Sequence, residues 1–155
     1  MEFFDFRRDR TAADAVMDRM REEIARDGYG WTAAEIAATA ECIGFIGLHQ
    51  VEIPELASAG TCEIGWRLAP EFWGKGFASE GAGALLDFGF NQLNLNEIIS
   101  FAVWSNVRST AVMERLGMHR DPTADFDHPR VVDPQLRSHV LYRLKREDWL
   151  ARHPL

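Results

Sequence analysis

Residues 71–80 read Glu71-Phe72-Trp73-Gly74-Lys75-Gly76-Phe77-Ala78-Ser79-Glu80. This stretch joins a strand-like run that ends near Leu68 to an amphipathic helical pattern. Glycine accepts positive φ and lets another group approach the main chain closely. A helix start presents unpaired N–H groups and the positive end of the helix dipole, so this turn suits a phosphate group. Taken alone, the motif is equally compatible with an ordinary helix entry.

The helix that follows has the clearest periodicity in the chain. Its apolar positions recur at helical spacing and define one buried face: Ala82, Leu85, Leu86, Gly89, Phe90 and Leu93. Each glycine inside a helix weakens it by roughly 1 kcal/mol relative to alanine. The glycines at positions 81, 83 and 89 therefore predict close packing of this helix against a sheet.

The remaining elements are expected on both sides of this helix. A helix is predicted from Thr11 to Asp27, with Asp14 in a capping-box-like position. Apolar or alternating runs predict strands at 31–36, 42–51, 61–68, 97–104 and 139–146, and a short helix follows Asn106 and runs through Leu116. Gly44 and Gly47 suggest a bulge or a close neighbouring backbone. The polar residues 118–137 predict a long loop, and the tail after Asp148 shows little pattern.

Length and composition limit the classes of function. A chain of 155 residues predicts a single mixed α/β domain over residues 1–155. The net charge of −7 argues against a nucleic-acid partner and is compatible with a cationic substrate. No apolar run predicts a membrane span. Cys42 and Cys62 have no metal or redox spacing, so we expect ordinary buried thiols in a reducing, cytoplasmic compartment.

Several landmarks, in order and spacing, resemble the GNAT superfamily of acyl-CoA-dependent N-acetyltransferases, and in particular the branch that includes the RimJ and RimL ribosomal-protein acetyltransferases. They cover nearly the whole chain and comprise residues 43–48 (IGFIGL), 63–68 (EIGWRL), 72–80 (FWGKGFASE), 106–109 (NVRS) and 113–118 (MERLGM). The resemblance implies a GNAT fold: a mixed, mostly antiparallel twisted sheet with helices on both faces and a splayed central strand pair. It also implies acetyl-CoA as co-substrate.

Two features depart from that family pattern. The phosphate loop of the superfamily usually opens with Gln or Arg where this chain has Trp73. The branch also begins with a strand and a short helix, whereas Met1-Glu2-Phe3-Phe4 resembles the segment just after that helix. We therefore expect the first strand and helix to be missing. An uncovered sheet edge is an association hazard, so we expect a homodimer or some other cover for that edge.

By resemblance, the cofactor site extends from the splayed strand to the glycine turn. The pantetheine arm would pair with backbone groups of Trp66, Arg67 and Leu68, and Asn106 would hydrogen-bond the same arm. Asn106 is equally suited to cap the short helix. The pyrophosphate would lie on the main-chain amides of the loop residues, which are Trp73, Gly74, Lys75, Gly76, Phe77, Ala78 and Ser79.

Two residues are candidates for catalysis. By resemblance, Ser109 lies near the thioester sulfur, where its hydroxyl could protonate the leaving thiolate. Glu63 is the candidate general base, because many family members have a Glu beside the acetyl group, often acting through water. A solvated strand residue is the equally weighted alternative for Glu63. Glu80 suits the helix dipole, and Tyr142 is expected in the core rather than as an acid.

The predicted activity is transfer of an acetyl group from acetyl-CoA to a primary amine by direct attack, because no side-chain nucleophile stands out. The acceptor would be a protein N-terminal amine or a small-molecule amine. A non-catalytic acyl-CoA-binding protein and a structural partner-binding domain are the alternatives. The five histidines show no metal spacing, although His49 and His139 could lie on strands near the acceptor.

Overall fold

The computed structural model describes residue 3 and residues 9–53, 56 and 60–153. Five α-helices and seven strands follow one another in these residues, with two 3₁₀ turns, η1 and η2. In chain order they are α1 (Arg10–Asp27), β1 (Trp31–Ile36), β2 (Glu41–Gln50), β3 (Cys62–Leu68), η1 (Pro70–Phe72), α2 (Phe77–Asn91), β4 (Glu97–Val103), α3 (Val107–Arg115), β5 (His119–Arg120), η2 (Pro122–Ala124), β6 (Phe126–Asp127), α4 (Pro134–Arg137), β7 (Ser138–Lys145) and α5 (Arg146–Arg152).

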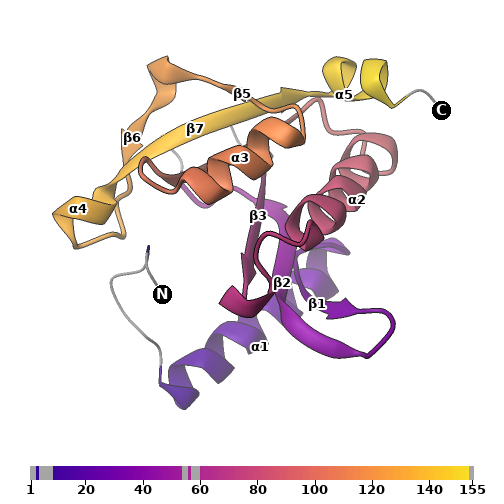
Figure 1. Ribbon diagram of the computed structural model, residues 1–155, viewed down its shortest axis with the longest axis vertical. Coiled ribbons are helices and arrows are strands. Elements are labelled where there is room, and N and C mark those ends of the chain that lie inside the picture. The colour runs from indigo at the N-terminus through magenta and orange to yellow at the C-terminus, as the bar shows by residue number, and fades with distance from the viewer. Residues whose placement is uncertain (1–2, 4–8, 54–55, 57–59, 154–155) are drawn as a thin grey trace.

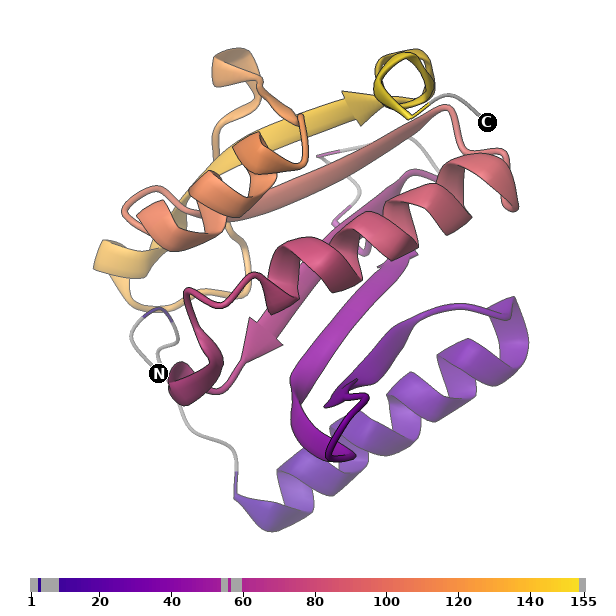
Figure 2. The ribbon, with the colours of Figure 1, turned by 45° about the vertical axis from the view of Figure 1, so that its right-hand side comes forward.

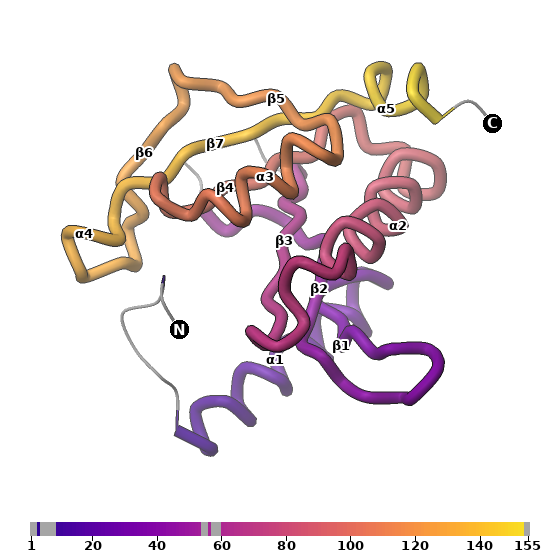
Figure 3. Tube along the Cα trace, in the orientation of Figure 1, coloured from indigo at the N-terminus to yellow at the C-terminus, as the bar shows by residue number. Residues whose placement is uncertain are grey.

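All seven strands belong to one sheet with the order β1-β2-β3-β4-β7-β5, and β6 also pairs with β7 (Figure 1). Every pair is antiparallel except β3 with β4, which are parallel. The chain returns after α4 so that β7 lies beside β4 over its whole length (Figure 3). The predicted mixed, mostly antiparallel sheet is confirmed.

The central helix α2 packs on one face of the sheet, as its glycines predict (Figure 2). A Cβ at Gly81 would lie 2.5 Å from Ile46 Cδ1, and one at Gly89 would lie 2.8 Å from Ile98 Cδ1. Both contacts are with the methyl ends of side chains, so a larger residue at either position would require those side chains to shift. Gly83 makes only ordinary contact, since its Cβ would lie 3.8 Å from Leu116. The interface is buried on both sides: Leu48, Ile64, Ile98 and Leu144 on the strands and Leu86 and Phe90 on α2 are all at 0% exposure.

The first helix lies on the opposite face, where it is only lightly attached. Its last turn shares a pocket with His49, whose side chain points away from the face that α2 covers. None of its residues is buried, and Met17 on its apolar stripe is 52% exposed. Helices therefore flank both faces of the sheet. Among the described residues, no helix is long and apolar enough to cross a membrane.

Several local predictions were wrong. Helix α1 begins one residue before Thr11, because Asp9 is the N-cap and its carboxylate accepts from Ala12 N at 2.8 Å. Asp14 pairs with Arg10 instead of closing a capping box. Cys42 is exposed, and only Cys62 is buried.

The predicted long loop 118–137 carries β5, η2, β6 and α4, because its polar residues find partners along β7. The tail forms α5, anchored by Trp149, which is 4% exposed and packs on Phe90. Elsewhere the expected strand and helix ends are within about two residues of the observed ones.

The predicted irregularity in β2 is confirmed. The β1–β2 register shifts between Ala34 and Glu35, opposite Gly44, whose φ is 142°. A Cβ at Gly44 would lie 2.1 Å from the Arg67 carbonyl oxygen, so no side chain fits there. Strand β1 is the end strand of this sheet. Of the segment Met1-Glu2-Phe3-Phe4, only Phe3 lies within the described residues.

Candidate active site

The glycine turn leads directly into α2 and leaves the first helical amides open. Gly74 has φ 71°, and Gly76, the N-cap, has φ 89° and ψ −12°. Within the described part of the chain, no side chain caps the helix start. A Cβ built at either glycine meets nothing within 4 Å. The first N–H groups of a helix have no intrahelical acceptor, so this turn offers amides and open space to an anion.

Two arginines beside this turn were not identified from the sequence. Arg115, at the end of α3, donates from Nη1 to Ser79 Oγ at 2.9 Å. The guanidinium of Arg108 lies 4.6 Å from the ring centroid of Trp73. Both side chains come from α3, which packs beside α2. Together with Lys75, they give the turn a positive environment in a chain whose net charge is −7.

The parallel pair β3–β4 opens toward the same turn. Only Cys62 with Ile98 and Glu63 with Ile99 are in register, although β3 continues to Leu68 and β4 to Val103. The Ser100 hydroxyl donates to the Ile64 carbonyl at 2.8 Å just past the last paired rung. Beyond it the two strands separate and form no further ladder pairs, although β3 continues through Trp66 to Leu68. The predicted splayed strand pair is confirmed.

Trp73 connects the turn to the end of this splayed strand. Its indole N–H donates to the Leu68 carbonyl at 2.7 Å, and its side chain remains 41% exposed. Leu68 itself is 8% exposed. The aromatic residue that departs from the family pattern therefore fixes the geometry between β3 and the glycine turn.

Asn106 and Ser109 lie at the start of α3, at the open end of the splay. The Asn106 side-chain oxygen accepts from Ser109 N at 3.2 Å, so the capping role is confirmed. Ser109 is half-buried. The cation–π contact between Arg108 and Trp73 brings this helix start to the glycine turn. The predicted cofactor residues of the two segments thus lie around one opening.

Glu63 lies at the other end of the splay, on its last paired rung. Five residues of extended chain separate it from Leu68, about 16 Å at the usual strand rise. Its carboxylate lies 3.4 Å from His49 Nε2, and the two side chains are 14% and 16% exposed. Burial lowers the pKa of His49, but the Glu63 carboxylate, with Glu23 and Glu52, outweighs burial and raises it. Glu63 is therefore a partly buried, paired residue and not a solvated strand residue.

One row of side chains crosses the sheet through Glu63. His49, Glu63, Ile99 and Arg143 are successive cross-strand partners on β2, β3, β4 and β7. Directly opposite residues project from the same face, so this row lies on the face away from α2. Strands are spaced about 4.8 Å apart, which places Arg143 about 10 Å from Glu63.

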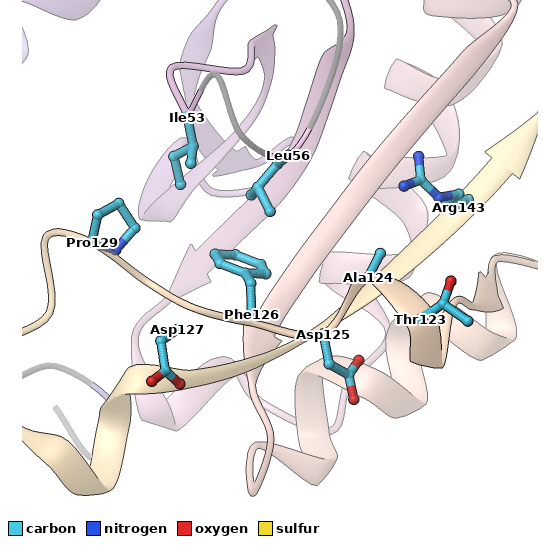
Figure 4. A pocket seen from close by; sticks show the side chains of 9 residues that line it. All are labelled: Ile53, Leu56, Thr123, Ala124, Asp125, Phe126, Asp127, Pro129 and Arg143. Atoms are coloured by element: carbon cyan, nitrogen blue, oxygen red, sulfur yellow. The ribbon is translucent and has the colours of Figure 1, made fainter.

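A pocket of about 420 Å³ lies on this face beside Arg143 (Figure 4). Ile53 and Leu56 lie opposite Phe126 and Pro129, and Arg143 stands at the other end. Arg143 is paired with Glu97 at 2.9 Å and with Asp121 at 2.8 Å, so its charge is compensated. Asp125 and Asp127 also line the pocket. The pocket combines apolar walls with carboxylates, which suits an amine on an apolar body.

Aromatic and imidazole rings lie on the same face of the sheet, toward the open end of the β3–β4 splay. Phe101 lies 5.3 Å from Phe126 and 6.0 Å from His139, and the His128 and His139 rings lie 5.0 Å apart. Burial lowers the pKa of His128 and His139, and their mutual proximity lowers that of His128 further. Tyr142 points to the other face, where its hydroxyl donates to Glu114 at 3.0 Å. It is a core residue, as expected.

A glycine turn at an uncapped helix start, beside a splayed parallel strand pair, is an arrangement that suits an extended ligand carrying a phosphate group. The sequence profile of the acetyltransferase (GNAT) domain matches residues 1–119. The chain belongs to the GNAT acetyltransferase family.

Individual relatives agree with this family. The chain is 32% identical over 120 residues to the FsC-acetyl coenzyme A-N(2)-transacetylase of Aspergillus fumigatus, covering 73% of this chain and 49% of that protein. It is 35% identical over 112 residues to the uncharacterized N-acetyltransferase p20 of Bacillus licheniformis, covering 72% of this chain and 60% of the relative. The chain thus spans about half the length of the curated relatives it matches.

Solved structures show the same fold. The acetyltransferase from Agrobacterium tumefaciens str. C58 superposes with a TM-score of 0.68 at 33% identity, covering 88% of this chain and 72% of that chain. A spermidine N-acetyltransferase SpeG variant from Vibrio cholerae reaches a TM-score of 0.70 at 20% identity, covering 90% of this chain and 79% of that chain.

Proposed function

We propose that this chain transfers an acetyl group from acetyl-CoA to a primary amine by direct attack. The observation that carries the proposal is the open amide turn of α2 at the mouth of the β3–β4 splay. The main-chain amides from Gly74 to Ser79 would hold the pyrophosphate, with Lys75 and Arg115 adding positive charge. The backbone from Trp66 to Leu68, beyond the last β3–β4 ladder pair, would hold the pantetheine arm. Asn106 would hydrogen-bond that arm with its amide.

Acetyl-CoA, when bound, supplies an activated acetyl thioester. The chain's own residues then control the protons. Glu63, at the closed end of the splay, accepts a proton from the amine so that its nitrogen can attack. A new C–N bond forms, the C–S bond breaks, and Ser109 donates a hydrogen bond or proton to the departing thiolate. An N-terminal amine, with a pKa of about 7.7–8.0, needs less help than an alkylamine at about 10.4.

The acceptor would approach from the face that carries Glu63, since α2 and α3 cover the other face. Carboxylates on this side include Glu23 and Asp127, while Glu52 is paired with Arg130 and Asp125 with Arg120. Glu23 and Asp127 favour a cationic acceptor. The likeness to the RimJ and RimL branch supports a protein N-terminal amine, and the apolar pocket beside Arg143 supports a small amine with an apolar body.

A second copy of the chain is proposed to cover the exposed edge of strand β1. A monodisperse monomer in light scattering would exclude this dimer.

Calorimetric titration with acetyl-CoA tests the proposal first, followed by a thiol-release assay over N-terminal peptides and small amines. Stoichiometric binding at micromolar affinity, about −8 kcal/mol, with thiol release is the expected result. Binding without thiol release for any amine would favour a non-catalytic acyl-CoA-binding protein. A folded sample that does not bind acetyl-CoA would refute the proposal.

A further inference from the structure

His49 is fixed against Glu63 by a packing arrangement that uses two glycines. The Trp31 ring lies 4.8 Å from the His49 ring, centroid to centroid. A Cβ at Gly47 would lie 2.6 Å from Trp31 Cε3, and one at Gly65 would lie 2.6 Å from Trp31 Cη2. The Trp31 indole therefore occupies the space that a side chain at either position would need. The indole packs against one side of the imidazole. This contact limits rotation of the imidazole and keeps its Nε2 directed toward the Glu63 carboxylate.

The other side of His49 borders a second pocket, of about 180 Å³. The charged and titratable groups that face the imidazole are Glu63 on β3, Glu23, Arg26 and Asp27 on α1, Tyr29 before β1, and Glu52 after β2. Asp27 is paired with Arg26 at 2.7 Å, and Glu52 with Arg130 at 2.8 Å. His49 therefore lies between Glu63, at the closed end of the splay, and a polar pocket rich in carboxylates.

We propose that His49 is a positioning residue that orients Glu63 toward the acceptor amine and passes the amine's proton to the carboxylate-lined pocket. This inference rests on the proposed acetyl transfer. It assigns to β2 and α1 a role in the reaction, because the pocket that receives the proton is built from the last turn of α1 and the end of β2.

The relay accounts for the one proton that the reaction releases. An ammonium acceptor and an acetyl thioester give an amide, a free thiol and one proton in excess. The amine proton goes to Glu63, and the neutral imidazole of His49 accepts it across the 3.4 Å contact. The imidazolium then releases it into the pocket, and Glu63 is again a carboxylate. The carboxylates of Glu23 and Glu52 stabilise the transient charge.

The kinetic test uses His49→Gln, which preserves polarity but carries no proton. With an alkylamine that the wild type acetylates, kcat should fall about tenfold. This loss is smaller than the roughly 10²–10⁴-fold loss expected for a group that transfers the proton directly. The acidic limb of the pH profile of kcat/KM should move to lower pH, because the variant lacks the imidazole, whose pKa the neighbouring carboxylates raise in the wild type. Affinity for acetyl-CoA should be unchanged. His119→Gln is the matched control, since His119 is an exposed histidine at the far end of the same cross-strand row.

A second test does not depend on an acceptor. The His49 imidazole is titrated by NMR in the wild type and in Glu63→Gln. We expect the pKa of His49 to fall in the variant, because burial then acts with less opposition.

The outcomes separate the two proposals. Unchanged titration of His49 in Glu63→Gln, or an acidic limb that stays in place in His49→Gln, would overturn the relay. Failure of the wild type to bind acetyl-CoA or to release thiol would instead overturn the proposed function. A lowered kcat with an unmoved acidic limb would show a purely structural role for His49, which also contradicts the inference.

Discussion

The substitution Gly76→Ala tests the glycine turn, and Gly28→Ala is its matched control. Gly76 has φ 89° and ψ −12°, and Gly28, which caps the end of α1, has φ 79° and ψ −1°. A Cβ at either position meets nothing within 4 Å. The two substitutions therefore impose the same backbone strain at an N-cap and at a C-cap, and only the first lies at the proposed pyrophosphate site.

The expected magnitudes follow from this geometry. A left-handed conformation costs a non-glycine residue about 1–2 kcal/mol, partly offset by about 0.4–1 kcal/mol from the lower entropy of the unfolded chain. Each variant should then lose about 1 kcal/mol of stability. For a chain of this size, that loss lowers Tm by about 2–4 °C.

Only Gly76→Ala should weaken acetyl-CoA binding, because its Cβ would occupy the space that the amides offer to a phosphate. A loss of about 1.4 kcal/mol corresponds to a tenfold weaker Kd. Calorimetric titration of both variants, with Tm from scanning calorimetry, measures both effects. Equal affinities for acetyl-CoA in Gly76→Ala and Gly28→Ala, at similar losses in Tm, would refute the assignment of the turn.

Three further outcomes are expected. Arg115→Gln removes the donor to Ser79 and should weaken acetyl-CoA binding about 3- to 10-fold in calorimetry, with a smaller difference at high salt; salt-independent affinities would contradict this. Gly47→Ala places a Cβ 2.7 Å from Trp31 Cα and should lower the free energy of unfolding by about 1–3 kcal/mol in urea titration, and an unchanged midpoint would show that β1 adapts freely. Burial lowers the pKa of His139, so its contribution to stability is present above the unfolded value near 6.5 and is lost as pH falls. His139→Gln should therefore lose less Tm between pH 7.5 and pH 5 than the wild type, and an equal loss would assign the acid sensitivity to other groups.

The sequence predicted a helix or strand well where the pattern that identifies it lies within that element. The apolar stripe and internal glycines of α2 predicted a helix packed closely on a sheet, and a Cβ at Gly81 or Gly89 would meet side chains of the sheet within 3.0 Å. The irregularity in β2 followed from Gly44 in the same way. Residues 118–137 could not be assigned, because two-residue strands have no periodicity and exist only where β7 offers partners. The N-cap of α1 was missed because Asp9 and Thr11 are both good caps, and only one is in position.

The candidate site shows the same contrast between features that the local sequence encodes and features that depend on residues distant in sequence. The turn from Trp73 to Ser79 was readable because its chemistry depends on backbone conformation, which glycine and helix-start preferences encode within ten residues. The partners of that turn were not readable, since Arg115 reaches Ser79 across 36 positions of sequence. For Glu63, the sequence left a base and a solvated carboxylate equally open, and its pairing with a buried His49 decided the environment.

The sequence by itself determined the GNAT order of elements, the glycine turn and the candidate residues, because these depend on local conformational preference and spacing along the chain. Only the tertiary structure decided which groups share an electrostatic environment. Charges and hydrogen bonds act over a few ångströms through space, and the register of β2, β3, β4 and β7 is what brings His49, Glu63 and Arg143 into one row.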